Sequence, residues 1–237
     1  MSRGAYLMEL GRVPYREAWE LQRSVAGAVS QGAIPDTVIL LEHPPVITLG
    51  RRAEEGELHI PGGADVEIVE TDRGGKSTYH GPGQLVCYPI LDLRRHGQDV
   101  KRYCRDLEEA LIRTLAPLGV AATRIEGLTG IWLEPPPRKI ASIGIHVSRW
   151  VTTHGYALNV DLDTAPFTEW ITACGLEDAA FTTIARELGR PVETDEVRPL
   201  AIAALADVFE LELEELPAED GAGLWPQPVH AQIAAAD

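Results

Sequence analysis

Residues 129–162 read TGIWLEPPPRKIASIGIHVSRWVTTHGYALNVDL, and this stretch decides the fold because it predicts three β-strands joined by turns. Apolar and small residues alternate through its middle part, KIASIGIH at residues 139–146, which is typical of a strand. A proline-rich loop precedes Arg138 and Lys139 and separates one expected strand from the next. The stretch therefore indicates a sheet, which the segments on either side extend.

The spacing of apolar residues elsewhere predicts helices that alternate with further strands. Helices are expected at 14–32, 99–119 and 195–216, and strands at 36–50, 66–71 and 84–93. Pro14 and Gly32 begin and end the first helix, where each residue type is favoured. Pro44 and Pro45 split the first strand region in two, and Pro199 must fall near the start of the last helix. This order predicts an α/β fold, an α+β mixed sheet flanked by helices, with one domain over residues 1–216 and a mobile acidic tail over residues 217–237.

The charge of the chain is unevenly distributed. Residues 1–150 carry 18 Lys and Arg against 19 Asp and Glu, whereas residues 151–237 carry 3 against 17. The formal net charge of −15 argues against a nucleic-acid-binding protein. We interpret the acidic second part as a solvated face, which leaves the positive residues of the first part available for an anionic ligand or partner.

Two features of the sequence bear on where the protein works. No apolar run approaches the roughly 18–20 residues that span a bilayer, so we expect no membrane association. The N-terminal stretch MSRGAYLMELGRVPYREAWE reaches charged residues too soon for a signal peptide. We therefore expect a cytoplasmic protein.

The chain has three cysteines, Cys87, Cys104 and Cys174, which we expect to be free thiols in a reducing compartment. Cys87 lies in an apolar strand and Cys104 in an amphipathic helix, where small buried hydrophobic residues are usual. Cys174 stands before Gly175 in FTEWITACGL, and it could be buried filler, half of a disulfide, a metal ligand or a nucleophile. The spacing of Cys and His gives no support for a zinc site, and no second cysteine is nearby.

The segment RGGKSTYHGPGQ, residues 73–84, has a composition that a core strand does not need. Its four glycines let a ligand approach the backbone closely, and the His-Gly-Pro-Gly bend would hold His80 in a fixed position. It matches neither the P-loop pattern nor the dinucleotide-binding pattern. The alternative is a tight surface loop with incidental polar residues.

Two strand segments suggest a slender ligand beside the sheet. In KIASIGIH, Ala141, Ser142 and Gly144 would leave room beside the strand, and an apolar slot next to a lysine suits an acyl chain better than a sugar or a nucleotide. In HGYALN, residues 154–159, a histidine and a glycine again precede small residues at the end of a strand. By position alone, however, Lys139 reads as an ordinary exposed lysine at a strand start.

Four segments together resemble the lipoyl(octanoyl) transferase family. They are EHPPVITLGRR, RGGKSTYHGPGQLVCYPILDL, KIASIGIHVSRWVTTHGYALNVDLD and PFTEWITACGL, and they cover most of residues 36–176. The resemblance implies an acyltransferase with the fold of the biotin and lipoate protein ligases. It implies that an octanoyl group moves from acyl carrier protein to a lysine of a lipoyl domain, in 2-oxoacid dehydrogenases or the glycine cleavage H protein. It implies no cofactor, because the acyl group arrives on the phosphopantetheine of the carrier protein.

The resemblance also assigns roles to residues. It makes Cys174 the acyl-thioester nucleophile and Lys139 its activating partner. The residues that it places at the substrate site are Arg73, Gly74, Gly75, Lys76, Ser77, Thr78, Tyr79, His80, Ser142, Ile143, Gly144, Gly155, Tyr156 and Ala157. His43 and His154 are candidates for orienting groups. The sequence departs from many relatives at Lys76 and Ser77, where Gln-Val is common.

Three other functions stay open at this point. An ATP-dependent lipoate ligase on the same fold would need a nucleotide site and no Cys174. A cysteine hydrolase would release the acyl chain to water, using Cys174 with His80 or His154. A non-catalytic acyl-binding module would leave Cys174 inert.

An acidic carrier protein would need a local basic surface on this acidic chain. Positive residues gather around the start of the helix expected at 99–119, namely Arg94, Arg95, Lys101, Arg102 and Arg105. Arg51 and Arg52 form a second, smaller group. The alternative is that the residues of the first group solvate the helix and pair with its acidic neighbours.

Overall fold

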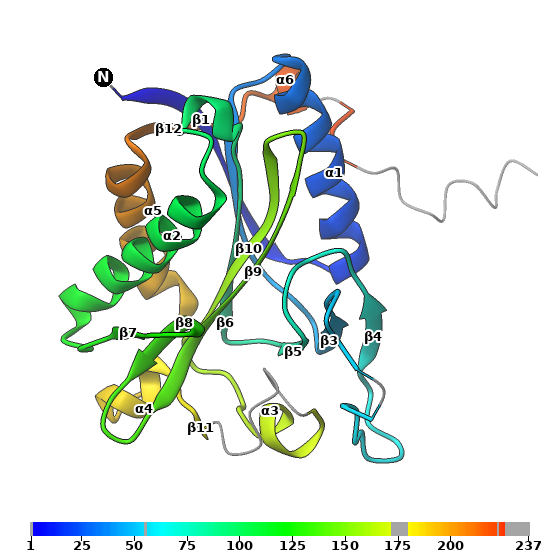
Figure 1. Cartoon of the computed structure of the whole chain (residues 1–237), viewed down its shortest axis with the longest axis vertical. Coiled ribbons are helices and arrows are strands. Elements are labelled where there is room, and N and C mark those ends of the chain that lie inside the picture. Colours follow the sequence, from blue (N-terminus) through cyan, green and yellow to red (C-terminus); the bar gives the residue numbers. More distant parts are fainter. Residues whose placement is uncertain (1, 55, 172–179, 222, 226–237) are drawn as a thin grey trace, which may run out of the picture.

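The structure is a computed structural model that describes residues 2–54, 56–171, 180–221 and 223–225. A nine-stranded mixed sheet runs through the molecule in the order β12-β1-β2-β6-β10-β9-β8-β7, with β11 paired to β9 (Figure 1). Its strands are β1 (Arg3–Arg12), β2 (Asp36–Glu42), β6 (Gln84–Ile90), β7 (Thr123–Ile125), β8 (Leu128–Leu133), β9 (Arg138–Ser148), β10 (Val151–Asn159), β11 (Ala180–Phe181) and β12 (Leu211–Glu215). A second sheet has the order β4-β3-β5, with β3 (Val46–Leu49), β4 (Glu67–Glu70) and β5 (Ser77–His80).

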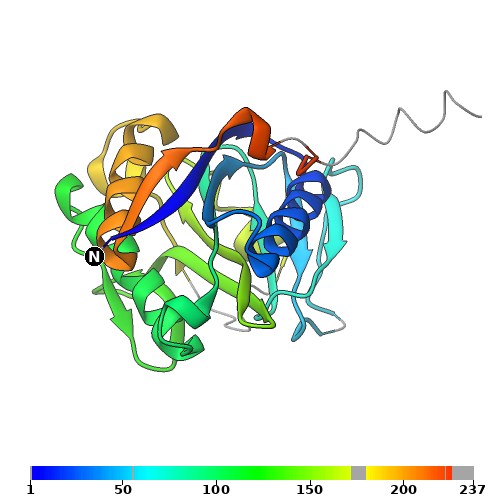
Figure 2. The same cartoon turned by 90° about the horizontal axis from the view of Figure 1, so that it is seen from above.

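Helices cover both faces of the large sheet (Figures 1 and 2). In chain order they are α1 (Tyr15–Gln31), α2 (Val100–Leu115), α3 (Pro166–Glu169), α4 (Ile184–Leu188), α5 (Thr194–Phe209) and α6 (Ala218–Gly221). One apolar cluster joins α2 and α5 to one face, and a separate cluster joins α1 to the other. The expected mixed sheet flanked by helices is therefore confirmed.

Local sequence explains the two long helices that border the sheet. The buried residues of α1 include Ala18, Leu21, Val25 and Val29, which recur at three- and four-residue steps and form one apolar stripe. The helix ends at Gly32, whose φ of 71° is left-handed and suits glycine. In α2, the carboxylate of Asp99 accepts hydrogen bonds from the backbone N–H groups of Lys101 and Arg102, so this helix begins after an N-cap residue.

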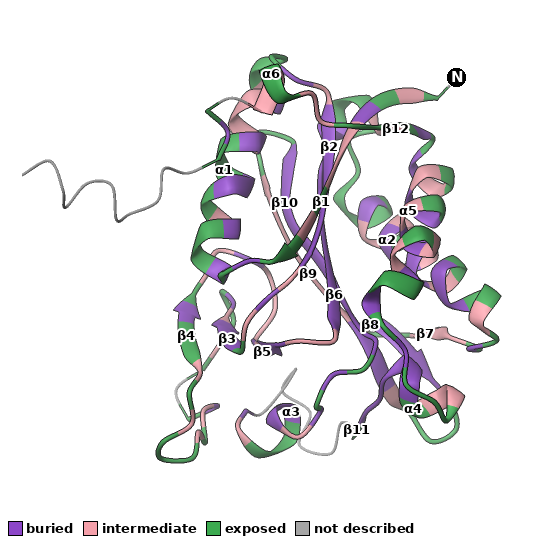
Figure 3. Ribbon diagram, turned by 180° about the vertical axis from the view of Figure 1, so that it is seen from behind, coloured by how far each residue is buried: buried purple, intermediate pink, exposed green. Residues whose placement is uncertain are grey.

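The centre of the sheet consists of strands that are buried on both faces. Every residue of β6 and of β10 is buried, and Figure 3 shows these central strands in purple between exposed outer helix faces. The three strands expected from residues 129–162 are β8, β9 and β10, which pair antiparallel. The strands expected around Pro44 and Pro45, at 66–71 and at 84–93 are also present, as β2, β3, β4 and β6.

The expected helix at 195–216 is correct only in part. The helix α5 ends at Phe209, and residues Leu211–Glu215 form β12, which pairs parallel with β1. Leucine and glutamate alternate there with a period of two, and that local pattern prevails once β1 offers an edge to pair with. The strand β1 itself, and β5 inside the glycine-rich segment, were not expected from the sequence.

The described part of the C-terminal region packs against the domain. The Tyr6 hydroxyl donates a hydrogen bond of 2.5 Å to Asp220, and Leu224 belongs to the apolar cluster around α1. Residues 226–237, the rest of the expected mobile tail, lie outside the described residues. None of the helices in the described ranges is both long and apolar enough to cross a bilayer.

Candidate active site

A cavity lies where β5 and the loop before it face β9 and β10. Its apolar lining comes from Val86, Ile143, Tyr156 and Ala157, and its polar lining includes Arg73, His80, Lys139 and His154. We call it the first cavity. It combines an apolar wall with a few buried polar groups, which is the usual composition of a site for a small organic ligand.

Lys139 is not the exposed lysine that its position alone suggested. It is the second residue of β9, its side chain is 4% exposed, and its Nζ lies 5.2 Å from the centre of the Trp132 ring. Gly130 lies beside its stem, because a Cβ at 130 would come within 2.7 Å of Lys139 Cε. An ammonium group is thus held in a narrow buried slot, where a surface lysine would be free to move.

Arg73 holds the glycine-rich loop in place through hydrogen bonds. Its guanidinium group donates to the hydroxyl and the carbonyl oxygen of Thr48 at 2.6–3.0 Å, and it also donates to Gly74 O. The loop then lies directly on β9, since Gly74 N donates to Ile145 O at 2.8 Å. A Cβ at Gly144 would come within 3.1 Å of Gly74 O. The absence of a side chain at Gly144 thus lets the loop lie close to β9, and Gly144 also lines the first cavity.

The His-Gly-Pro-Gly bend holds His80 through a chain of amide side chains. His80 Nδ1 donates to Gln84 Oε1 at 2.7 Å, and Gln84 Nε2 donates to Asn159 Oδ1 at 2.9 Å. Gly83 has a φ of 82°, and its N–H donates to Glu42. Burial lowers the pKa of His80 to about 3, so the ring is neutral at pH 7. Its Nε2 is then a hydrogen-bond acceptor on a residue that lines the first cavity.

Two further histidines fix the hydroxyl protons of two tyrosines. His43 Nδ1 must donate to Val13 O at 2.7 Å, so its Nε2 accepts from the Tyr88 hydroxyl at 2.7 Å. His154 Nε2 donates to Asp72 at 2.7 Å, so its Nδ1 accepts from the Tyr15 hydroxyl at 3.4 Å. Tyr15 and Tyr88 therefore present acceptor lone pairs to any ligand in the first cavity, which both residues line.

The pKa values agree with these tautomers. Burial lowers the pKa of His43 to about 4 and also lowers the pKa of His154. The hydrogen bond from His154 lowers the pKa of Asp72 to about 2. At pH 7 the two imidazole rings are therefore neutral, and Asp72 is charged.

A distortion of β10 places His154 on the side of the sheet that α1 covers. His154 has a φ of 57°, which is unusual for a residue other than glycine. A Cβ on the next residue, Gly155, would overlap the carbonyl oxygen of Cys87 and lie 2.7 Å from Pro89 Cδ. The strand β6 carries Pro89, which has no N–H for the ladder. His154 thereby reaches Tyr15 and Asp72.

A second cavity adjoins the first. The two cavities share Gly75, Lys76, Lys139, Ile143 and Gly144 in their linings. The second extends to α2 and β8, where it is lined by residues that include Cys104, Leu128, Thr129 and Trp132, and it also includes Arg52. Lys139 thus lies at the junction of two spaces that lead to different parts of the molecule.

Two carboxylates restrict the side chain of Lys76 at this junction. Its Nζ lies 3.1 Å from both Glu54 and Glu57, and these hydrogen bonds raise its pKa. Glu57 also accepts hydrogen bonds from the N–H and the hydroxyl of Ser77. The two positions that depart from many relatives, Lys76 and Ser77, are thus tied to the same carboxylate.

The structure brings most of the expected substrate-site residues together. Those that line the first cavity are Arg73, Gly75, Lys76, Ser77, Thr78, His80, Ser142, Ile143, Gly144, Gly155, Tyr156 and Ala157. Gly74 lines the second cavity only. Tyr79 lines neither, because it packs edge-on against Phe167 and Trp170. Ala141, expected to leave room for a ligand, is fully buried in the apolar cluster with α2 and α5. The roles of these residues stay predictions.

The structure describes two of the three cysteines. Cys174 lies outside the described residues. Cys87 is fully buried, as expected of a structural residue, and burial raises the pKa of its thiol well above the ordinary value. Cys104 is half-buried, and burial raises the pKa of its thiol as well.

Three polar residues of the site were missed by the sequence analysis. Tyr15 is the first residue of α1, Asp72 lies before the glycine-rich loop, and Tyr88 sits in β6. Nothing in their linear spacing joins them to His43 and His154. The folded chain alone brings these five residues into one group.

Comparison with known proteins gives the family of the chain. The family model for the lipoyl protein ligase A/B catalytic domain matches residues 14–206. The chain is 53% identical over 199 residues to an octanoyltransferase of Mycobacterium tuberculosis, which is 83% of this chain and 84% of that protein.

Solved structures with little sequence identity share the fold. The crystal structure of a lipoate-protein ligase A bound with ATP has a TM-score of 0.77 and 16% identity, over 94% of this chain and 92% of that one. A biotin protein ligase from Aquifex aeolicus, in complex with biotin and ATP, has a TM-score of 0.52 and 12% identity, over 86% of this chain and 70% of that one. The expected fold of the biotin and lipoate protein ligases is confirmed by these likenesses.

Proposed function

The chain belongs to the lipoyl protein ligase A/B catalytic domain family, and we propose that it transfers an octanoyl group to a lysine of lipoyl domains. It is an acyltransferase, as its identity of 53% to a named octanoyltransferase over most of both chains supports. The observation that carries the proposal is the buried lysine at the junction of two cavities, next to an apolar wall that suits an acyl chain. The acceptors that we propose are the lipoyl domains of 2-oxoacid dehydrogenases and the glycine cleavage H protein.

We propose that the acyl group passes through Cys174. The thiolate attacks the thioester carbonyl of the donor, the bond to the donor sulfur breaks, and the departing thiolate takes up a proton. The acceptor lysine amine then attacks the new thioester, loses a proton, and the thiolate of Cys174 is released. The first step exchanges one thioester for another and the second forms an amide, so neither step needs ATP, a metal or another cofactor. The raised thiol pKa values of Cys87 and Cys104 argue against either of them as the nucleophile.

Lys139 is the residue that we propose for the proton transfers. As an ammonium group it favours a nearby thiolate and gives a proton to the departing donor thiol; it then takes a proton from the incoming amine. Its slot between Trp132 and Gly130 supports this role, because a group that shuttles a proton must keep a fixed position.

The first cavity is the place that we propose for the octanoyl chain. Val86, Ile143 and Ala157 offer it an apolar wall. The neutral rings of His80 and His154 avoid placing buried imidazolium charges beside that chain.

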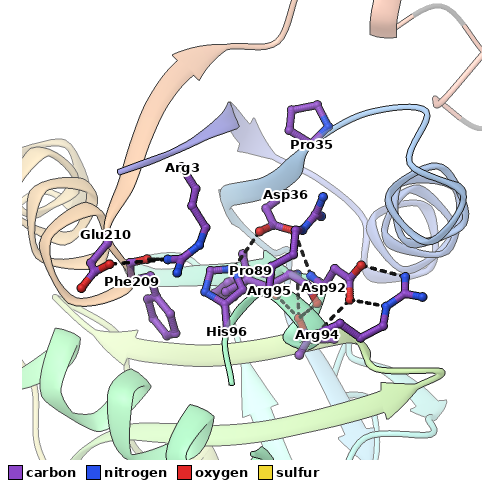
Figure 4. A network of polar contacts seen from close by, with 12 residues as sticks. Arg3, Pro35, Asp36, Pro89, Asp92, Arg94, Arg95, His96, Phe209 and Glu210 are labelled. Carbon is purple, nitrogen blue, oxygen red and sulfur yellow. Dashed lines mark hydrogen bonds and ion pairs between the residues drawn. The ribbon is translucent and has the colours of Figure 1, made fainter. Parts of the chain in front are cut away.

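Acyl carrier protein is the donor that we propose, and the structure changes where we expect it to dock. In the first basic group, Arg94 pairs with Asp92 and Arg95 pairs with Asp36, as Figure 4 shows. Arg102 lies 3.6 Å from Asp106, and Arg105 lies 2.7 Å from Glu108. Arg102 and Arg105 therefore pair within the helix, as the alternative interpretation expected, whereas Arg94 and Arg95 have acidic partners outside it.

The position of this first group also argues against docking there. Arg94 and Arg95 follow the end of β6 that is opposite to Gln84, whereas Gln84 and Lys139 lie near the same end of the sheet. A seven-residue strand spans roughly 20 Å. We therefore propose that the carrier protein docks at the mouth of the second cavity, near Arg52.

Intact-mass analysis after acid trapping tests the proposed function. Incubation with octanoyl-acyl carrier protein alone should give an octanoyl adduct, and Cys174→Ala should lose it. Cys87→Ala is the matched control and should keep the adduct, because Cys87 lines neither cavity. Cys174→Ser should also lose transfer, since a serine hydroxyl is a poorer nucleophile and leaving group than a thiol.

The other outcomes would support the rival functions. Turnover that needs ATP, without an adduct, would indicate a lipoate ligase. An adduct that yields free octanoate and no transfer would indicate a hydrolase. Neither adduct nor turnover would leave an acyl-binding module. We also propose a cytoplasmic location, which the free thiols of Cys87 and Cys104 support.

A further inference from the structure

We propose that the second cavity receives the phosphopantetheine arm of the acyl donor, with Arg52 contacting its phosphodiester. This inference rests on the proposed function, because it assumes a thioester donor. A thioester has two arms that leave one carbonyl carbon, the acyl chain and the thiol arm. If the chain occupies the first cavity with its carbonyl near Lys139, the thiol arm must leave by another route. The second cavity provides that route, because it shares Lys139 with the first.

The charge of the second cavity suits an anionic arm. Its described lining residues include Arg52, Lys76 and Lys139, and none of them is acidic. Lys76 is already neutralised by Glu54 and Glu57. Arg52 is exposed, and no ion pair joins it to another residue of the described ranges. In a chain of net charge −15, such a positive lining is unusual and favours a phosphate over the cationic arm of an acceptor lysine.

The lining of the second cavity suits a long, thin ligand that has both polar and apolar parts. Leu128, Ile143 and Ile145 give it apolar surface, while Thr129 and the backbone of Gly74 and Gly75 give it polar groups. The pantetheine part of the arm alternates amide groups with short methylene runs. The arm can therefore lie along the cavity with its thiol end at Lys139 and its phosphate at Arg52.

Two donors that differ only in the phosphate test this inference. One is octanoyl-phosphopantetheine and the other is octanoyl-pantetheine, and the readout is kcat/KM for the appearance of the octanoyl adduct. Arg52→Ala should lower this value roughly tenfold for the phosphorylated donor, since a charge-assisted hydrogen bond contributes about that factor. The ratio between the two donors should fall toward one. Arg51→Ala is the matched control, because Arg51 is also exposed but lines neither cavity.

A second variant keeps the test independent of Arg52. Thr129 is exposed on β8 and lines only the second cavity, so Thr129→Glu adds a negative charge there with little risk to the fold. It should penalise the phosphorylated donor more than the other. In either variant, transfer from the preformed octanoyl enzyme to a lipoyl domain should change less than adduct formation from the phosphorylated donor.

Three results would overturn the inference. An equal effect of Arg52→Ala on both donors would mean that Arg52 does not contact the phosphate. An effect on the transfer to the lipoyl domain alone would mean that the cavity serves the acceptor. Kinetics of Arg52→Ala that match those of Arg51→Ala throughout would leave Arg52 without a role in donor binding. The absence of any adduct in the unmodified protein, from either donor, would instead overturn the proposed function and this inference with it.

Discussion

Lys139 Nζ lies over the face of the Trp132 ring, 5.2 Å from its centre. The two residues come from paired strands, since Trp132 of β8 is the register partner of Lys139 of β9. A cation over an indole ring is attracted by the electrons of the ring, and the contact contributes about 0.5–2 kcal/mol depending on burial. The pair therefore fixes the position of the ammonium group that both cavities share.

Replacing Lys139 tests whether proton transfer or charge alone matters. Both Lys139→Ala and Lys139→Arg should lower the transfer rate at least about 100-fold, because arginine keeps the charge but cannot give up a proton. The measurement is octanoyl transfer to a lipoyl domain, with the thermal midpoint of unfolding as a check on the fold. Lys101→Arg, on the exposed face of α2, should behave like the unmodified protein. A near-normal rate in Lys139→Arg would show that Lys139 acts only as a counter-ion.

Replacing Trp132 tests whether the ring positions Lys139. Trp132→Phe keeps an aromatic face, whereas Trp132→Leu removes it, so kcat should fall about tenfold in the leucine variant and less in the phenylalanine variant. No hydrogen-bond partner of Trp132 Nε1 is found among the described residues, so loss of the indole N–H should cost little by itself. Equal kcat values in the two variants would argue that only the volume of the side chain matters.

Gly155→Ala tests the close approach of β10 to β6. The added Cβ would overlap the Cys87 carbonyl oxygen and press on Pro89, and both neighbours belong to a buried strand that cannot yield easily. We expect a loss of roughly 3 kcal/mol in the free energy of unfolding, measured by urea denaturation. Gly27→Ala is the control, since Gly27 lies in α1 with open space around it, and it should stabilise the protein by roughly 0.5–1 kcal/mol. Similar values for the two variants would contradict the packing seen at Gly155.

The buried histidines make stability depend on pH. In the unfolded chain a histidine binds a proton near pH 6.5, whereas burial lowers the pKa of His43 to about 4 and of His80 to about 3. The unfolded state therefore binds more protons between these values, so stability falls as the pH decreases below about 6.5. Each such group contributes a slope of about 1.4 kcal/mol per pH unit in that window.

His43→Gln should lower the slope of the free energy of unfolding against pH by about 1.4 kcal/mol per pH unit between pH 6 and pH 4.5. Urea denaturation at several pH values measures it, and His59→Gln is the control because His59 is exposed. An unchanged slope in His43→Gln would mean that His43 is protonated in the folded state. The low pKa of Asp72, about 2, acts in a lower window, where its stabilising effect is lost between about pH 4 and pH 2.

The sequence predicted most of the fold because each element carried its own local signal. Alternation and proline or glycine boundaries marked β2, β3, β6 and the strands of residues 129–162, and three- and four-residue steps marked α1 and α2. The strand β12 was missed because it follows α5 directly and its glutamates also favour helices. Its pairing with β1, more than 200 residues away in sequence, was not visible in either segment.

The candidate site was predictable only where residues cluster in short motifs. The glycine-rich loop and the lysine of β9 were named from sequence, and the structure brings them to one cavity. The burial of Lys139 was not predictable, because it depends on Trp132 and Gly130 across the β8–β9 pairing. The sequence also carried no sign of three polar residues of the site, Tyr15, Asp72 and Tyr88. Their place in the site depends on hydrogen bonds to histidines that are far away in sequence.

The order of the large sheet has a consequence for how copies of the protein behave toward one another. Its path ends at β12 on one side and at β7 on the other. An open strand edge invites pairing with another chain, and proteins suppress this with charges or with very short edge strands. The strand β12 carries exposed carboxylates at Glu212, Glu214 and Glu215, while β7 is only three residues long. Part of the acidity of the C-terminal region thus acts as electrostatic repulsion between copies, which keeps the β12 edge from pairing with a second chain.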